Sequence, residues 1–346
     1  MFIGICGSIC AGKRTIARYL VDHHGFTQLY LDPRPSTEAD NAVDRVEALS
    51  NSTSSSSTPS SRQHLFPTPD DLLDFVTKNW RERWVTTDIP NEAVLDMYTR
   101  RPFFLLISVD APVTPSPPPS LDDNLPIPTT LEAFVHLSDT HLYSPTSAAN
   151  TLISRATVRL LNTSSSLAHL YATLGKLDLL NADRLRPSWD AYFMALASLA
   201  AQRSNCMKRR VGCVVVRDKR VISTGYNGTP RGLVNCGEGG CGRCNAGEGS
   251  GHGLATCLCI HAEENALLEA GRERVRDGAV LYCDTCPCLT CSIKIVQVGV
   301  REVVYSQGYS MDGETAAVFR EAGVRLRQFV PPANGLIHLE KPELYT

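Results

Sequence analysis

Four residues in the last third of the chain have the types and spacing of a catalytic metal site. His261 lies two positions before Glu263, and Cys288 and Cys291 follow Pro287 with two residues between them. One imidazole and two thiolates can bind a zinc ion and leave its fourth position open for water. Glu263 can transfer protons beside the metal without binding it. The spacing therefore predicts a zinc site that activates water.

The order of these residues along the chain indicates the class of reaction. H-x-E followed by P-C-x-x-C is the signature of zinc-dependent deaminases, which act on an amino-bearing pyrimidine or purine carbon. Zinc lowers the pKa of its water toward neutrality, and Glu263 would take the water proton and then protonate the ring nitrogen and the departing amine. The alternatives are a closed zinc site and inert buried cysteines. Pro287 and the strand-then-helix context favour a catalytic zinc.

Both halves of the motif are expected at the start of helices. The helix of His261 is predicted over 260–272, and the helix of Cys288 and Cys291 over 288–298. The two cysteines are then one helical turn apart on one face. The partial positive charge of helix N-termini favours thiolates at these positions.

Alternating strands and helices surround these two helices and predict a domain over 186–330. It begins with a helix over 189–203 that Ser188 can cap. The remaining expected elements are a hairpin at 211–218 and 221–225, strands at 279–285, 302–306 and 325–329, and a helix at 313–322. This alternation predicts three α/β/α layers around a mostly parallel sheet. Residues 331–346 are expected to form an irregular tail.

A second α/β domain is predicted over 1–185, since 346 residues suggest two domains. It opens with strand, glycine-containing loop, helix and strand over 1–31. The other expected elements are a buried strand at 103–109 and helices at 70–84, 130–142 and 165–180. Serine- and proline-rich insertions at about 33–68 and 113–128 have little apolar content to bury, so we expect them to be disordered.

The glycine-containing loop nearly matches a phosphate-binding P-loop. Gly7, Gly12 and Lys13 have the right spacing between a strand and a helix. Arg14 stands where the motif needs serine or threonine for magnesium. We interpret this domain as a degenerate P-loop kinase-like scaffold or regulatory module. It could bind phosphate through Lys13 and backbone amides, with kinase turnover as the alternative.

Composition excludes several partner classes. The net charge of −2 gives no field that attracts nucleic acid polymers or anionic membranes, but suits a small nucleotide held by a few local cations. Eleven of 13 cysteines lie between Cys206 and Cys291. Without a secretory signal such cysteines stay reduced and can bind metal. We expect neither export nor a membrane span, and a cytoplasmic location with nuclear presence left open.

Longer motifs resemble one enzyme family. The segments that carry the resemblance are HAEENA at 261–266, GYNGTP at 225–230, RSNCMKRRVGC at 203–213 and YCDTCPCLTC at 282–291. They resemble deoxycytidylate deaminases, particularly the fungal members. The resemblance implies the cytidine deaminase fold, conversion of dCMP to dUMP for dTTP synthesis, and a homo-oligomer. It also implies activation by dCTP with Mg²⁺ and inhibition by dTTP.

The same resemblance suggests three substrate residues. Asn227 matches an asparagine that contacts the nucleoside, although a turn residue bonding its own backbone is the alternative. Arg272, on the expected flank of the His261 helix, matches an arginine for the 5′-phosphate, with a solvated helix-end arginine as the alternative. Tyr309 matches a tyrosine near the substrate, with packing as the alternative.

A second metal site is predicted upstream of the His261 helix. Part of the family carries a structural zinc there, and Cys206, Cys236 and Cys259 match its ligands by position. We assign Cys257 as the fourth ligand; the competing candidates are Cys241, Cys244 and His252. The C-x-x-C pair of Cys241 and Cys244 has the spacing of a zinc knuckle. The surrounding segment is glycine-rich and weakly apolar, so a metal would supply its order, and free thiols in a flexible loop are the alternative.

Two other classes of function compete with deamination of dCMP. One is a kinase that uses the P-loop, and the other is a non-enzymatic zinc-binding protein, for which Glu263 would have no use. Within deaminases, the other substrates are cytidine, guanine, tRNA adenosine and single-stranded DNA cytosine. The acidic balance disfavours the polynucleotides, and the G-Y-N-G turn with Arg272 favours a monophosphate.

Overall fold

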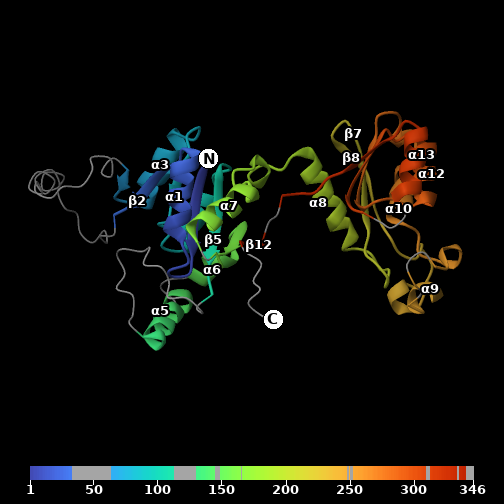
Figure 1. Cartoon of the computed structure of the whole chain (residues 1–346). Helices are drawn as coiled ribbons and strands as arrows, with labels where there is room; N and C mark the ends of the chain where they lie inside the picture. The colour runs from blue at the N-terminus through green and yellow to red at the C-terminus, as the bar shows by residue number, and fades with distance from the viewer. Residues whose placement is uncertain are drawn as a thin grey trace, which may run out of the picture. The chain divides into compact units, whose positions relative to one another are not determined.

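The computed structural model describes residues 1–32, 64–112, 130–144, 149–164, 166–247, 249, 252–308, 312–332 and 335–339. The chain divides into two compact units, Met1–Leu185 with Ala333–Thr346, and Arg186–Pro332 (Figure 1). The insertions expected to be disordered lie outside the described residues, except for 64–68. These last residues are ordered, because Leu65–Phe66 form a strand and Thr68 caps the following helix.

The first unit contains a seven-stranded sheet in the order β12-β6-β5-β1-β4-β2-β3, and every neighbouring pair is parallel. The strands are β1 (Phe2–Gly7), β2 (Thr27–Leu31), β3 (Leu65–Phe66), β4 (Trp84–Thr86), β5 (Phe104–Asp110), β6 (Val158–Leu161) and β12 (Gly335–His338). β1 and β5 are almost continuously apolar and buried, as strands covered on both faces must be.

Helices cover both faces of this sheet. The helices of this unit are α1 (Lys13–His24), α3 (Pro69–Lys78), α4 (Glu92–Thr99), α5 (Leu131–Tyr143), α6 (Ala149–Ser154) and α7 (Leu167–Leu177), followed by the short 3₁₀ helix η1 (Ala182–Arg184). Among them, α5 packs mainly against α6 and not on the sheet. Ile3 and Ile5 pack with α1 and α7, whereas Phe2 and Cys6 pack with α3, α4 and α6. The alternation along β1 therefore divides the core into two layers.

One strand of the first unit comes from the region predicted to be an irregular tail. Gly335–His338 form β12, which pairs in parallel with β6, and Leu339 is buried in the core of the first unit. The prediction was wrong because β12 is short and its partner lies far away in the sequence. Local patterning gives no sign of such a pairing.

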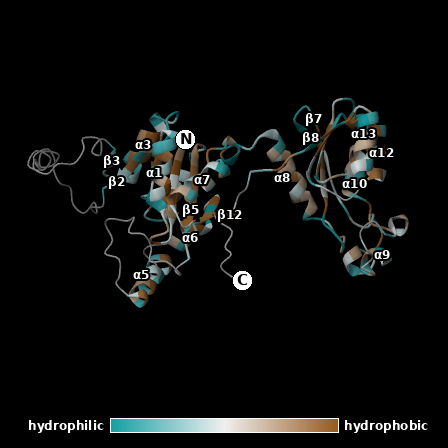
Figure 2. Cartoon of the chain, in the orientation of Figure 1, coloured by the Kyte–Doolittle hydropathy of each residue, from teal (hydrophilic) through white to brown (hydrophobic). Residues whose placement is uncertain are grey.

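The second unit contains a five-stranded sheet in the order β11-β10-β9-β7-β8. Its strands are β7 (Gly212–Arg217), β8 (Arg220–Tyr226), β9 (Val280–Thr285), β10 (Glu302–Gln307) and β11 (Arg325–Gln328). β7 is antiparallel to β8 and β9, while β9, β10 and β11 run parallel. Figure 2 shows hydrophobic residues concentrated in the strands of both sheets.

Helices on the two faces of this second sheet make three layers. Helix α8 (Trp189–Ala201) packs on one face, with Phe193 against Val214 and Tyr282. On the other face, α10 (Ala262–Ala270), α12 (Leu289–Val298) and α13 (Asp312–Glu321) pack against alternate residues of the same strands, including Val215 and Leu281. The predicted α/β/α arrangement with a mostly parallel sheet is confirmed.

Two glycines let helices lie directly on the sheet. A Cβ at Gly225 would lie 2.2 Å from the carbonyl oxygen of Ala262, at the start of α10. A Cβ at Gly212 would lie 2.0 Å from the carbonyl oxygen of Ala197, in α8. Close backbone contact therefore fixes the first turn of α10 against β8.

None of the helices in the described residues is long and apolar enough to cross a membrane.

Candidate active site

Two helix N-termini present the predicted zinc ligands. His261 is the N-cap of α10, and its side chain makes no capping hydrogen bond. Paired hydrogen bonds between the backbones of Gly228 and Ile260 hold the residue that precedes it. Cys288 is the N-cap of α12, and Cys291 lies in the first turn of that helix. The fold thus leaves the imidazole and both thiols free to converge beyond the helix ends.

The three donor atoms have separations that suit zinc. His261 Nδ1 lies 3.3 Å from Cys288 Sγ and 3.3 Å from Cys291 Sγ, and all three atoms lie within 4.8 Å of one another. Tetrahedral zinc, with bonds of about 2.0 Å to nitrogen and about 2.3 Å to sulfur, separates such atoms by about 3.5 Å. One nitrogen and two sulfurs therefore fit zinc in both chemistry and geometry, with one position left for water.

Hydrogen bonds within the site favour a thiolate. They join Cys288 to Cys291, His261 and Thr290, and lower the pKa of the Cys288 thiol to about 3 although burial opposes this. The same contact with Cys288 raises the pKa of His261. Negative charge is therefore favoured where the metal would bind.

Glu263 lies beside these ligands in the first turn of α10. Its side chain is only 4% exposed, and burial raises the pKa of its carboxyl to about 7. A carboxyl with a pKa near neutrality can both accept and donate a proton, which is what an acid–base catalyst requires.

Contacts that the sequence did not indicate hold the two ligand helices in place. Lys294 of α12 pairs with Glu264 of α10 at 2.7 Å. The buried Thr315 of α13 donates a hydrogen bond of 2.9 Å to the carbonyl of Pro287, next to Cys288. Asn265 donates to the carbonyl of Tyr226, which joins α10 to β8. Lys294 and Thr315 lie outside the motifs singled out in the sequence, and the motifs that contain Glu264, Asn265 and Pro287 do not indicate these partners.

Asn227 is buried and holds a neighbouring segment. Its Oδ1 accepts hydrogen bonds from the backbone of Val211 at 2.8 Å and from Ser204 Oγ at 2.7 Å. Its Nδ2 donates to the carbonyl of Arg209 at 2.7 Å. The amide thus orders residues 204–211 rather than only its own turn. Contact with a nucleoside stays a prediction.

Arg272 lies elsewhere than the sequence predicted. Helix α10 ends at Ala270, and Gly271 has a φ of 67°, so the exposed Arg272 begins the separate helix α11 (Arg272–Val275). The glycine breaks the expected helix, and the nine residues of α10 span about 14 Å from its start. Arg272 is therefore not on the flank of the His261 helix, and its phosphate role stays a prediction. Tyr309 lies outside the described residues.

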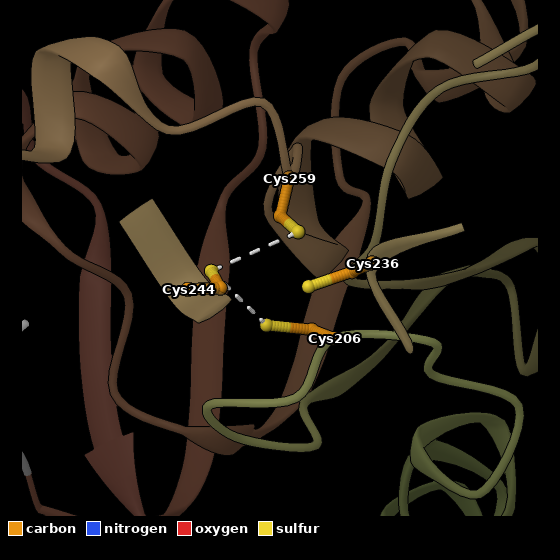
Figure 3. A group of neighbouring side chains, drawn as sticks. All are labelled: Cys206, Cys236, Cys244 and Cys259. Carbon is orange, nitrogen blue, oxygen red and sulfur yellow. Dashed lines mark hydrogen bonds between the residues drawn. The ribbon is translucent and has the colours of Figure 1, made fainter. Parts of the chain in front are cut away.

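The cysteines predicted to form a second metal site lie close together, with one change in membership, and metal binding there stays a prediction. Cys206, Cys236 and Cys259 lie together, and their fourth neighbour is Cys244 rather than Cys257. Figure 3 shows the four sulfurs pointing toward one another from separate segments. Cys257 instead groups with Cys241, Cys244 and Cys259. Among the residues that the structure describes, the exposed His252 belongs to neither group.

Comparisons with known proteins agree with this site. Residues 187–307 match the family model described as the cytidine and deoxycytidylate deaminase zinc-binding region. A deoxycytidylate deaminase of Schizosaccharomyces pombe is 46% identical over 96% of this chain and 99% of its own. The chain belongs to the deoxycytidylate deaminase family.

Other members of the deoxycytidylate deaminase family match to different extents. The Saccharomyces cerevisiae deoxycytidylate deaminase is 43% identical over 95% of this chain and 96% of its own. The solved dCMP deaminase of cyanophage S-TIM5, in complex with dCMP and dUMP, is 31% identical over 40% of this chain and 94% of its own, with a TM-score of 0.33. The two fungal relatives thus match nearly the whole chain, including the first unit.

In this family member, the predicted phosphate loop joins β1 to α1. Gly7 has a φ of 139°, and a Cβ there would lie 1.9 Å from the carbonyl oxygen of Val109. Gly12 has a φ of 96° and caps α1. Lys13 Nζ donates to the carbonyls of Ser8, at 2.6 Å, and Gly7, at 3.3 Å. The loop has a defined conformation with the lysine turned onto its backbone, and phosphate binding stays a prediction.

Proposed function

We propose that this deaminase converts dCMP and water to dUMP and ammonia, and so supplies dUMP for dTTP synthesis. The observation that carries the proposal is the convergence of His261 Nδ1, Cys288 Sγ and Cys291 Sγ beside the buried Glu263. The choice of dCMP is supported by two relatives called deoxycytidylate deaminase, which match over 95% or more of this chain.

Metal binding and proton transfer are assigned to different side chains. His261, Cys288 and Cys291 would hold the zinc ion, which lowers the pKa of a water molecule toward neutrality when bound. Glu263 accepts a proton from the water and returns it to the ring nitrogen of the pyrimidine, then assists departure of ammonia. Its pKa of about 7 makes both directions of transfer accessible. The partial positive charges of two helix N-termini stabilise the thiolates throughout.

We assign nucleotide recognition to Asn227, Arg272 and Tyr309. Arg272 is the most testable of the three, because it is exposed and lies on a short helix outside the core. Arg272→Glu should raise the KM for dCMP about tenfold, the usual scale of one lost charge-assisted contact, and change the kinetics toward deoxycytidine little. The exposed Arg276→Glu is the matched control for the change of charge. Equal losses on both substrates would instead indicate damage to the fold.

The resemblance to the deoxycytidylate deaminase family also supports proposals on regulation and assembly. We propose a homo-oligomer, active in the cytoplasm, that dCTP with Mg²⁺ activates and dTTP inhibits. We also propose a structural zinc bound by the cysteines around Cys206, Cys236 and Cys259, whose sulfurs lie together. This metal would order a segment with little apolar content.

An ultraviolet assay of the full chain tests the proposed reaction. It compares dCMP, CMP, deoxycytidine and guanine as substrates, each with and without dCTP or dTTP. We expect dCMP to be deaminated with the highest kcat/KM, dCTP to increase the rate and dTTP to decrease it. Deamination of guanine or CMP in preference to dCMP would overturn the assignment of substrate.

A further inference from the structure

Six cysteines outside the catalytic site form a core of their own. Cys206, Cys236, Cys241, Cys244 and Cys259 are buried, and the half-buried Cys257 packs against them. This core contains no other hydrophobic residue among the described residues. The cysteines come from the segment after α8, the 3₁₀ helix η2 (Cys236–Glu238), the short helix α9 (Gly242–Asn245) and the segment before α10. Thiols alone are too small to organise four separate segments by burial of apolar surface.

The six sulfurs fall into two groups of four that share two members. One group is Cys206, Cys236, Cys244 and Cys259, and the other is Cys241, Cys244, Cys257 and Cys259. In each group every sulfur lies within 4.8 Å of the others. Cys244 and Cys259 belong to both groups, and their sulfurs are 3.9 Å apart.

The separations match two tetrahedra that share an edge. Four sulfurs about 2.3 Å from a zinc ion lie about 3.8 Å from one another. The observed distances are 3.8 Å between Cys206 and Cys244, 3.7 Å between Cys244 and Cys257, and 3.9 Å between Cys241 and Cys257. A disulfide needs sulfurs about 2.05 Å apart, and all of these cysteines are free thiols.

Two nitrogen donors contact sulfurs that belong to only one of the two groups. The backbone N–H of Met207 donates to Cys236 Sγ at 3.4 Å, and Arg243 Nη1 donates to Cys257 Sγ at 3.6 Å. These contacts favour thiolates at Cys236 and Cys257.

The two shared thiols have a different environment. Cys244 and Cys259 are buried, and each lies within 4.8 Å of the other sulfurs in both groups. Thiols placed so deeply among potential thiolates need a cation to ionise. Each shared thiol lies where it can contact a cation in either tetrahedron.

We propose that the six cysteines bind two zinc ions, with Cys244 and Cys259 bridging them. This goes beyond the single structural zinc of the proposed function, and it depends on that function only through the catalytic zinc in the total metal count. Two zinc ions do not neutralise six thiolates, and the guanidinium of Arg243 offsets part of the remaining negative charge. Soft thiolate ligands in tetrahedral groups favour zinc over harder divalent ions.

The cluster would also position the catalytic residues. Cys259 lies two residues before His261, and Ile260 between them pairs with Gly228. Cys206 follows Ser204 and Asn205, which hydrogen-bond to Asn227 and to the backbone of Thr229. Metal binding would thus tie the segment that enters α10 to the turn that contains Asn227.

Zinc content of the full chain, measured by elemental mass spectrometry with the protein concentration, tests the proposal. We expect three zinc ions per wild-type chain, one catalytic and two in the cluster. Cys241→Ser removes a ligand of only one tetrahedron and should leave two ions. Cys10→Ser, which changes a thiol of the first unit, is the matched control and should leave three. An equal zinc content in the wild type and Cys241→Ser would overturn the two-zinc cluster.

A second measurement does not depend on whether the variant folds. In the wild-type chain loaded with ¹¹³Cd, bridging thiolates should give two cluster resonances that are coupled to each other through sulfur. A single cluster resonance, or two without coupling, would overturn the proposal. Deamination assayed on the same samples separates the two hypotheses, since three zinc ions without deamination of dCMP would contradict the proposed function and leave the cluster intact.

Discussion

The candidate active site and the cysteine cluster of the second unit are supported by different parts of the structure. His261, Cys288 and Cys291 project from α10 and α12, which rest on a sheet through a large apolar core. The cluster joins short elements, and among the described residues their shared core consists of cysteine side chains. A site supported by its fold can spare a metal position for water, whereas a site that must hold the fold together uses every position for protein ligands.

The position of a carboxyl group also distinguishes the candidate active site from the cysteine cluster. Glu263 lies buried against the three-donor site, while both groups of four in the cluster consist of cysteines alone. Cys288 and His261 are partly accessible, whereas Cys206, Cys236, Cys244 and Cys259 are all buried. The two metal sites should therefore respond differently to chelators and to mutation.

Removal of zinc by a chelator should have the largest effect on deamination. With a graded excess of chelator, we expect one zinc ion to leave first and deamination to be lost completely, because the catalytic ligands are more accessible than the cluster. The circular dichroism spectrum should not change at that stage. Zinc release, activity and the spectrum are followed on one sample, and loss of the fold together with the first zinc would contradict the comparison.

Glu263→Gln should reduce kcat about 10³-fold, since general acid–base catalysis contributes about 10²–10⁴-fold, and should leave the zinc content unchanged. The amide has the size of the carboxyl but cannot carry the proton. Glu264→Gln is the control, because it removes only the ion pair with Lys294 and should cost little activity. Persistent turnover by Glu263→Gln would show that another group moves the proton.

Gly225→Ala should have an intermediate effect. Its Cβ would push the backbone of Ala262 away from β8, at a cost of about 2 kcal/mol of stability, and displace His261. We expect kcat to fall about tenfold or more, since small misplacements in an active site are costly. Gly212→Ala makes the equivalent clash with α8, which carries no ligand, and should cost similar stability in urea denaturation with a smaller loss of kcat. Equal losses of kcat in the two variants would mean that the contact between β8 and α10 does not position His261 more than the contact of α8 does.

Lys13→Ala should have the smallest effect. Lys13 belongs to the first unit, while the zinc ligands and Glu263 all belong to the second. We expect kcat/KM for dCMP without effectors to stay within about twofold of the wild type, as for independent sites. A large loss would show that the phosphate loop participates in deamination. ATP turnover that is abolished in this variant would instead revive the kinase hypothesis.

The convergence of His261, Cys288 and Cys291 was predictable because their chemistry and spacing are local. H-x-E and C-x-x-C each lie within one turn at a helix start, so the sequence predicted both the donor atoms and the helices. The three layers of the second unit were predictable for a similar reason, because the alternation of strands and helices is visible in the chain. Neither prediction required knowledge of which distant segments meet.

The errors concern features that only tertiary structure decides. The helical pattern in the sequence continues to Arg272, but Gly271 adopts a positive φ and starts a new helix. The fourth partner of Cys206 depends on how the turn of Cys241 and Cys244 faces two other segments, which spacing does not encode. Thr315 donates to the carbonyl of Pro287 from α13, although α12 and β10 lie between them in the chain, and no motif connects the two residues.

The pairing of β12 with β6 has a consequence for biosynthesis. The edge strand of the first unit follows the entire second unit in the chain, so the ribosome makes it only after residues 186–332. During synthesis, the deaminase unit can leave the exit tunnel and bind its metals while the sheet before it still lacks a strand. The first domain to begin is therefore the last to be completed, and its exposed β6 edge needs protection until Gly335–His338 arrive.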